Sequence, residues 1–426
     1  MGTIRYIGQL YGKGNNLFLL LLANMIMMPV VLLPDLNFIL TEVLLLVTII
    51  GAIPILKLFP FVDRLSRRVL ESCFLFFCIV LLYKVLGVSD SPWEYAAGYY
   101  CWMIVIFICI ITLESFPERY LRILEIGILA ISFLGIVYVI ITGNRNMQFM
   151  DLEEAISQES AAYGSFIVLY SGICFIAFLN YKKFVYRILY FVAMLAAIYM
   201  NFAVMQRGTN VIFTILMFIL IFIYRKKQHK KIRTILFSIF VTLLFLYTTG
   251  AYITVFDYLA EISPSERMAD RIRSINILLQ TGDYVEAGSS IKTRSELTIT
   301  SLDTFQSSGT NVLFGIGDTR NEDLIGCHSE IIDTLPRYGL LGFAFLAFAL
   351  LSQFHFFSKM LPKGSPLRSQ TLIIFIIFIL RNIIGNTLSH SVNVLLFLFL
   401  PAICLFITKQ DCSFDNKQSQ KVSFNI

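Results

Sequence analysis

The sequence predicts an all-α polytopic membrane protein, and three observations lead to this fold class. Of the 426 residues, 57% are hydrophobic and only 15% are charged. Soluble domains are about 25% charged, so this composition excludes an ordinary soluble protein. The apolar residues fall into separate long runs, and the basic residues gather between alternate runs. We expect about 12 transmembrane helices and one large, partly helical outer loop.

The expected membrane-spanning helices follow from the apolar runs. A transmembrane helix needs about 20 mostly apolar residues. Twelve runs meet this requirement, at 16–33, 37–59, 70–88, 96–113, 120–142, 162–180, 185–204, 209–224, 234–256, 338–356, 369–386 and 392–408. An even number of spans predicts that both chain ends lie on the same side of the membrane.

The basic residues predict which side this is, because loops inside the cell are enriched in lysine and arginine. If the N-terminus is cytoplasmic, every short inside loop is basic, and RKKQHKKIR (225–233) is the strongest example. Most short outside loops are not basic. The net charge of +6 therefore reflects membrane orientation, and no nucleic-acid partner is expected.

These boundaries divide the chain into four parts. Residues 1–256 hold transmembrane helices 1–9, and residues 257–337 form the large outer loop. Residues 338–408 hold transmembrane helices 10–12, and residues 409–426 form a cytoplasmic tail.

The large loop contains its own helix signals. The capping box Ser263-Pro264-Ser265-Glu266 places proline at the first helical position, and Gly282 is expected to end this helix. A second capping pattern, Thr293-Arg294-Ser295-Glu296, opens a run through Phe305. Two helices are therefore predicted in the first half of the loop.

The second half of the loop combines a turn with a short helix. Gly315 and Gly317 in NVLFGIGD (311–318) permit a tight turn. A third helix is expected to begin near His328-Ser329 and to stop near Pro336.

Several kinds of chemistry have no support in the sequence. It contains no Walker A loop, no GxGxxG, no HExxH and no CxxC. We therefore expect neither ATP hydrolysis nor a zinc site, and neither a cofactor nor a metal.

One histidine and three arginines are the candidate functional residues. His328 lies in the large outer loop, two residues before Glu330, and is either a structural residue or a general base. Arg207 stands at the outer junction of two spans, Arg294 in the loop and Arg381 within a span. Each arginine either extends toward the membrane surface or binds an anion.

The anion interpretation points to a phosphate or diphosphate, because arginine binds phosphate oxygens in bidentate geometry and keeps its charge. An enzyme outside the cytoplasm has no ATP, so its substrate must already be activated. A lipid-linked sugar diphosphate is such a substrate, since its diphosphate leaves readily when paired with cations.

These residues resemble a known family, the Wzy-type O-antigen polymerases, in the superfamily that also contains the O-antigen ligases. An arginine-glycine pair, a loop arginine, an FGxG turn and a histidine before a glycine-rich span start recur there in this order. The matching pieces lie within 205–342 and are Arg207-Gly208, Arg294 with Leu297 and the run to Phe305, LFGIGD (313–318), and His328 with PRYGLLG (336–342). Two positions depart from the pattern: Gln206 replaces a frequent serine, and Ser329 replaces the asparagine common in ligases.

The resemblance implies a multi-pass protein of the bacterial inner membrane with a periplasmic loop, similar to GT-C-like membrane glycosyltransferases. It implies metal- and nucleotide-independent joining of undecaprenyl-diphosphate-linked repeat units within membrane lipid, with a chain-length-determining co-polymerase as partner. Arg207, Arg294, Arg381, Gly315 and Gly317 form the expected substrate-binding set. His328 would orient or deprotonate the acceptor hydroxyl, and Glu330 would orient His328.

Two alternatives remain open at this stage. An O-antigen ligase would transfer finished glycan to lipid A-core, and Ser329 weakly favours the polymerase over it. A polysaccharide transporter or flippase should carry ionisable residues at mid-span, and these are few here.

Overall fold

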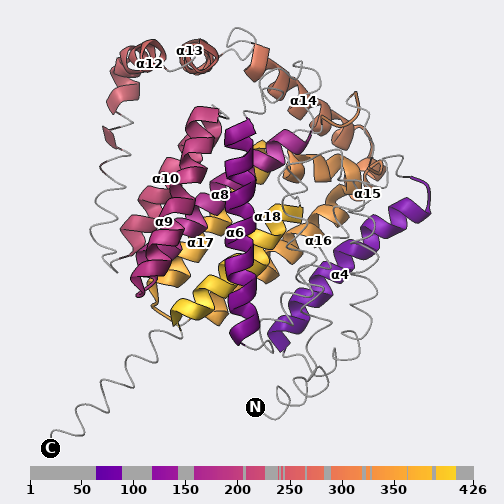
Figure 1. Cartoon of the computed structure of the whole chain (residues 1–426). Helices are drawn as coiled ribbons and strands as arrows, with labels where there is room; N and C mark the ends of the chain where they lie inside the picture. Colours follow the sequence, from indigo (N-terminus) through magenta and orange to yellow (C-terminus); the bar gives the residue numbers. More distant parts are fainter. Residues whose placement is uncertain are drawn as a thin grey trace, which may run out of the picture.

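The computed structural model describes thirteen stretches of the chain. They are residues 64–88, 118–142, 158–204, 208–225, 238, 241–242, 245–263, 266–282, 289–318, 323–326, 329–361, 363–385 and 390–408. Within these stretches the secondary structure is helical and contains no strand (Figure 1). This confirms the predicted all-α class for the described part of the chain.

A bundle of long helices forms the body of the molecule (Figure 1). Its members are α4 (Arg64–Val85), α6 (Glu118–Thr142), α8 (Gln158–Asn180), α9 (Phe184–Tyr199) with the π-helical turn η4 (Met200–Val204), α10 (Gly208–Tyr224), α16 (Glu330–Met360), α17 (Pro366–Ile384), and α18 (His390–Val394) continued by η5 (Leu395–Phe399). Helix α8 packs against α9, α10 and α17, and α16 packs along α4 and α17.

Three of the described helices are long and apolar enough to cross a membrane. They are Phe184–Phe202, Glu330–Met360 and Pro366–Ile384, and shorter apolar helices cover Gly164–Asn180, Thr209–Tyr224 and Val392–Thr408. These helices support membrane association. The count of twelve spans stays a prediction, and the runs 16–33, 37–59 and 96–113 lie outside the described residues.

Aromatic stacking and small residues hold the bundle together. The Tyr170 ring of α8 stacks on Phe399 of η5 with 6.1 Å between centroids. Phe357 of α16 stacks on Phe375 of α17 at 5.6 Å. A Cβ atom on Gly172 of α8 would overlap Met217 of α10, so this glycine permits the close approach that membrane helix pairs use.

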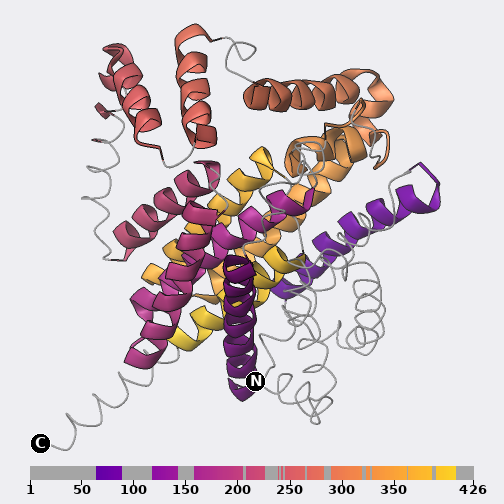
Figure 2. The same cartoon turned by 45° about the horizontal axis from the view of Figure 1, so that its top comes forward.

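The described part of the large loop is helical and lies across one end of the bundle (Figures 1 and 2). It contains α13 (Glu266–Thr281), α14 (Ser289–Gln306) and α15 (Gly309–Phe314), preceded by α12 (Ala251–Glu261). Helix α13 packs on α12, whereas α14 and α15 pack on α16.

The helix boundaries in the loop agree only partly with the sequence signals. Gly282 follows α13 with a φ of +69°, which confirms the predicted end of that helix. Helix α14 begins at Ser289, ahead of the capping pattern at Thr293. The predicted span 234–256 is interrupted, because left-handed Gly250 precedes a separate α12 that continues to Glu261.

The expected stop near Pro336 lies three residues before the break that the structure shows at Gly339. Helix α16 begins at Glu330 with Ser329 as its N-cap, passes through Pro336, and leaves helical geometry only at Gly339. The helix then resumes and continues to Met360. Pro336 removes one backbone donor from the first part of this helix, and the break itself lies at Gly339.

Candidate functional site

The loop Gly315–Asp318, which follows α15, docks on the break in α16. The backbone N–H groups of Ile316 and Gly317 donate to the carbonyl oxygens of Pro336 and Arg337 at 2.8 and 2.9 Å. Gly339 has φ +63° and ψ −169°, so these two carbonyls lose their usual acceptor role within the helix. The loop therefore replaces the hydrogen bonds that the break removes.

Glycine is required on both sides of this contact. A Cβ atom on Gly315 would lie 2.5 Å from the carbonyl of Arg337, and one on Gly339 would overlap the carbonyl of Leu313. Gly315 and Gly317 both have positive φ, which confirms the predicted tight turn. The contact gives these glycines a structural part in the site, and their part in substrate binding stays a prediction.

A buried arginine lies beneath the docked loop. The Nε of Arg337 is 3.0 Å from Oδ1 of Asp318, and its Nη1 is 3.6 Å from Oε1 of Glu330. All three residues are buried. Glu330, which was expected to orient His328, is therefore an ion-pair partner of Arg337. Through its contacts with Asp318 and Glu330, Arg337 joins the loop to the start of α16.

A third buried carboxylate, that of Asp333, ties α14 to the start of α16. The Oδ1 of Asp333 accepts from the Ser301 hydroxyl at 2.7 Å, and its Oδ2 accepts from the backbone N–H of Ser329 at 2.8 Å. Ser301 also accepts from the backbone N–H of Gly326 at 2.9 Å. Acidic side chains in the first turn of a helix are stabilised by the helix dipole, so this position suits Asp333.

Arg294 lies on the face of α14 that carries these contacts. It precedes Leu297 by three residues and Ser301 by seven, the spacing of one helix face. The Leu297 backbone lies directly against Gly326. The Arg294 side chain reaches solvent, and although desolvation by nearby atoms lowers its pKa, the group remains charged at neutral pH.

Arg381 is held inside the bundle. Its Nε and Nη2 donate to the Ser165 hydroxyl of α8 at 3.2 and 3.0 Å, and the side chain is buried. The guanidinium carbon lies 5.5 Å from the ring centroid of Phe213 on α10. Arg381 therefore bridges three helices from within, which does not fit a side chain that extends to the membrane surface.

A buried asparagine of α10 lies against α8 one residue before Ser165, the partner of Arg381. Asn210, in the first turn of α10, is fully buried and packs against Gly164, the residue before Ser165. Neither its amide nitrogen nor its amide oxygen has a hydrogen-bond partner among the residues that the structure describes. Such groups are uncommon in folded proteins and call for an explanation, such as a functional role or a bound water or ion.

One hydrogen bond joins the two halves of this region. The Ser329 hydroxyl donates to the carbonyl oxygen of Asn382, the residue after Arg381, at 3.2 Å. We call the region of Ser165, Asn210, Ser329, Arg381 and Asn382 the site end of the bundle. The starts of α10 and α16 and the last turn of α17 meet there.

Two of the predicted residues, Arg207 and His328, lie outside the described residues. Their chain neighbours belong to the site end: Gly208 begins α10 and Ser329 caps α16. Sequence patterns did not predict a site role for Arg337, Asp318, Asp333, Ser165 or Asn210. Asp318 directly follows Gly317, and Arg337 stands two residues before Gly339, so a charge close to a glycine turn was the available signal.

Comparisons with protein-family models and with curated proteins find no match to this chain.

Tyr83 connects α4 to the docked loop, and this contact can be tested. Its hydroxyl donates to the carbonyl oxygen of Phe314, and its ring meets Tyr338 edge-on at 5.4 Å. We expect Tyr83→Phe to weaken loop docking by about 1 kcal/mol, the value of one hydrogen bond. Hydrogen exchange of the Ile316 and Gly317 amides should accelerate.

Tyr258→Phe is the matched control for this variant, because Tyr258 is an exposed tyrosine on α12. It should leave the exchange of both amides unchanged. Equal exchange in the wild type and in Tyr83→Phe would show that the Tyr83 hydroxyl does not hold the loop.

Proposed function

We propose that this protein is a Wzy-type O-antigen polymerase of the bacterial inner membrane, with its site end facing the periplasm. The observation that carries the proposal is the buried guanidinium of Arg381, which contacts Ser165 of α8 and Phe213 of α10. A buried arginine among apolar helices is costly, and such residues commonly mark substrate pathways. A lipid-linked diphosphate is a partner of matching charge and depth.

The start of α10 adds to the attraction for an anion. Its first turn contains no acidic residue, and helix N-termini carry partial positive charge and unpaired N–H groups. Arg207 directly precedes this helix in the sequence. We propose that Arg207, Arg294 and Arg381 hold the undecaprenyl diphosphate of the donor, with Asn210 as an additional polar contact.

We propose that the acceptor, the incoming lipid-linked repeat unit, binds at the start of α16. Ser329 is fixed from both sides, because its hydroxyl accepts from the N–H of Ile332 and its own N–H donates to Asp333. His328 directly precedes this cap in sequence. We propose His328 as the general base, since the unperturbed imidazole pKa of about 6.5 suits proton transfer near neutrality. Glu330 acts as a positioning residue through Arg337.

The proposed reaction is a single displacement at a sugar. A hydroxyl of the incoming lipid-linked repeat unit attacks the anomeric carbon of the growing chain and loses its proton to His328. The bond from that carbon to the diphosphate breaks with inversion, and the arginines stabilise the departing undecaprenyl diphosphate. A chain-length-determining co-polymerase is the proposed partner.

Expression of His328→Ala and Arg294→Ala in a strain that lacks the chromosomal gene tests this function. Loss of a general base lowers a rate by about 10²–10⁴-fold, so the lipopolysaccharide ladder should disappear and leave core with a single repeat unit. A silver-stained gel measures the ladder, and an immunoblot of membranes confirms equal protein.

Arg273→Ala is the control, because Arg273 is an exposed arginine of α13 paired with Asp270. It should keep a normal ladder. Long chains of normal abundance in both site variants would refute the site. Core without any repeat unit in the deletion strain would reject the polymerase and favour a ligase or a flippase.

A further inference from the structure

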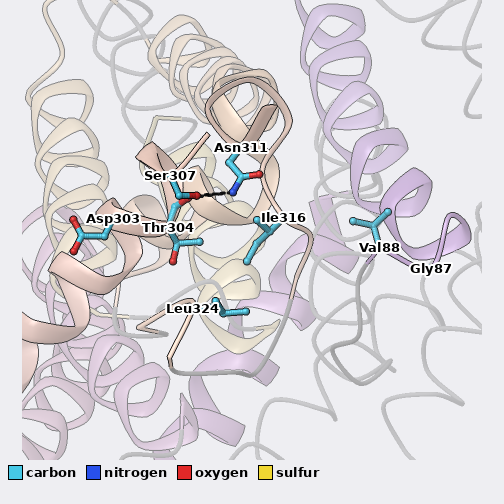
Figure 3. A pocket seen from close by; sticks show the side chains of 8 residues that line it. All are labelled: Gly87, Val88, Asp303, Thr304, Ser307, Asn311, Ile316 and Leu324. Atoms are coloured by element: carbon cyan, nitrogen blue, oxygen red, sulfur yellow. Dashed lines mark hydrogen bonds between the residues drawn. The ribbon is translucent and has the colours of Figure 1, made fainter. Parts of the chain in front are cut away.

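An open pocket of about 670 Å³ lies between α14, α15 and the end of α4, beside the docked loop. Figure 3 shows it from close by, with α14 and α15 on one side and Val88 across from them. Sites for small molecules typically have volumes of about 300–1,000 Å³. Its apolar lining includes Val88, Ile316 and Leu324, and its polar lining includes Asp303, Thr304, Ser307 and Asn311.

The polar wall presents mainly hydrogen-bond acceptors. The Nδ2 of Asn311 donates to the Ser307 hydroxyl at 2.8 Å and to the Thr304 carbonyl at 3.3 Å, so both amide hydrogens are used. The Ser307 hydroxyl in turn donates to the Thr304 carbonyl at 2.8 Å. Asn311 therefore offers a ligand its amide oxygen, and Asp303 at the rim offers an exposed carboxylate.

This chemistry selects against a phosphate. The lining residues that the structure describes include a carboxylate and no lysine, arginine or histidine. An anionic diphosphate would meet acceptors and a like charge, whereas a hydroxyl would find partners for its proton. The apolar wall suits the C–H face of a sugar ring, since ligand sites combine apolar surface with a few polar groups.

We propose that this pocket is a saccharide-binding site. It would bind hydroxyl-rich sugars that are uncharged or carry an amino group, and it is separate from the arginines of the site end. The assignment rests on the proposed function, because the sugar would belong to the lipid-linked glycan. Ile316 connects the two places: its side chain lines the pocket, and its N–H donates to Pro336 in the break of α16. The glycan would then be held beside the residues that position the reaction.

The test is direct binding to the full-length protein in lipid nanodiscs. The probes are the delipidated repeat-unit oligosaccharide of the same strain and inorganic pyrophosphate, both measured by saturation-transfer NMR titration. Asp303→Asn combined with Thr304→Val should weaken oligosaccharide binding by about tenfold or more, because each lost hydrogen bond contributes about 0.5–1.5 kcal/mol. Pyrophosphate binding should not change.

Thr300→Val is the matched control on the same helix, since the Thr300 hydroxyl donates to the Glu296 carbonyl at 3.0 Å. It should bind the oligosaccharide as the wild type does. Equal oligosaccharide affinity in the double variant and the control overturns the assignment, as does competition by pyrophosphate at this pocket. Oligosaccharide binding that depends on Asp303 and Thr304, in a strain whose ladder survives deletion of the gene, would support the pocket while rejecting the polymerase.

Discussion

Replacing Arg337 with methionine is expected to destabilise the protein by about 3–5 kcal/mol, the cost of removing one partner from a buried ion pair. Arg337 is 3% exposed and contacts both Asp318 and Glu330. Methionine keeps an unbranched apolar stem in place of the arginine stem but leaves two carboxylates, Asp318 and Glu330, without their cation. Thermal unfolding of the purified protein in nanodiscs measures the loss, and the lipopolysaccharide ladder should shorten or vanish.

A triple variant separates charge from packing in this experiment. Arg337→Met with Asp318→Asn and Glu330→Gln removes the whole ion-pair network and leaves no unpaired charge. We expect it to recover a large part of the lost stability, because neutral replacements of buried ion pairs are often tolerated. If the triple variant is no more stable than Arg337→Met, the unpaired charges of Asp318 and Glu330 are not the cause of the lost stability.

Gly339→Ala is expected to produce a loss of similar size through the backbone. A left-handed conformation costs an L-residue about 1–2 kcal/mol, and crowding in a packed region adds about 1–3 kcal/mol. The new Cβ would overlap the Leu313 carbonyl and push the loop away from α16. Faster hydrogen exchange at Ile316 and Gly317, together with a lower unfolding temperature, should report this displacement.

Gly364→Ala separates strain from overlap. Gly364 also has a positive φ, +79°, but a Cβ there would have no heavy atom within 4 Å. It should therefore show only the conformational cost of about 1–2 kcal/mol and normal exchange in the loop. Equal losses in the two variants would mean that Gly339 matters for its conformation alone and not for contact with the loop.

The features that the sequence predicted correctly are local. Long apolar runs predict helices because backbone groups in lipid must be paired within the helix. The end of α13 at Gly282 and the tight turn at Gly315 follow from glycine's tolerance of positive φ. Each of these depends on a few neighbouring residues, so no tertiary information is needed to infer it.

The features that the sequence did not predict depend on distant residues. Pro336 is a reasonable helix stop when considered alone, yet the break in α16 lies at Gly339, where the loop supplies donors to the carbonyls of Pro336 and Arg337. The pairing of Arg381 with Ser165 joins α17 to α8 across 216 positions. The pocket combines the end of α4 with α14 and α15, which no sequence pattern connects.

These separations imply an order in which the region forms during synthesis. The loop and the break it docks on are only about twenty residues apart, so closing this contact costs little chain entropy. It can therefore form as soon as the first turns of α16 have left the ribosome, and Tyr83, made far earlier, is already present to receive Phe314. Arg381 arrives later, with the end of α17, and only then can Ser165 and Asn382 complete their bonds. A nascent chain that stops before α17 would thus carry the docked loop without the site end.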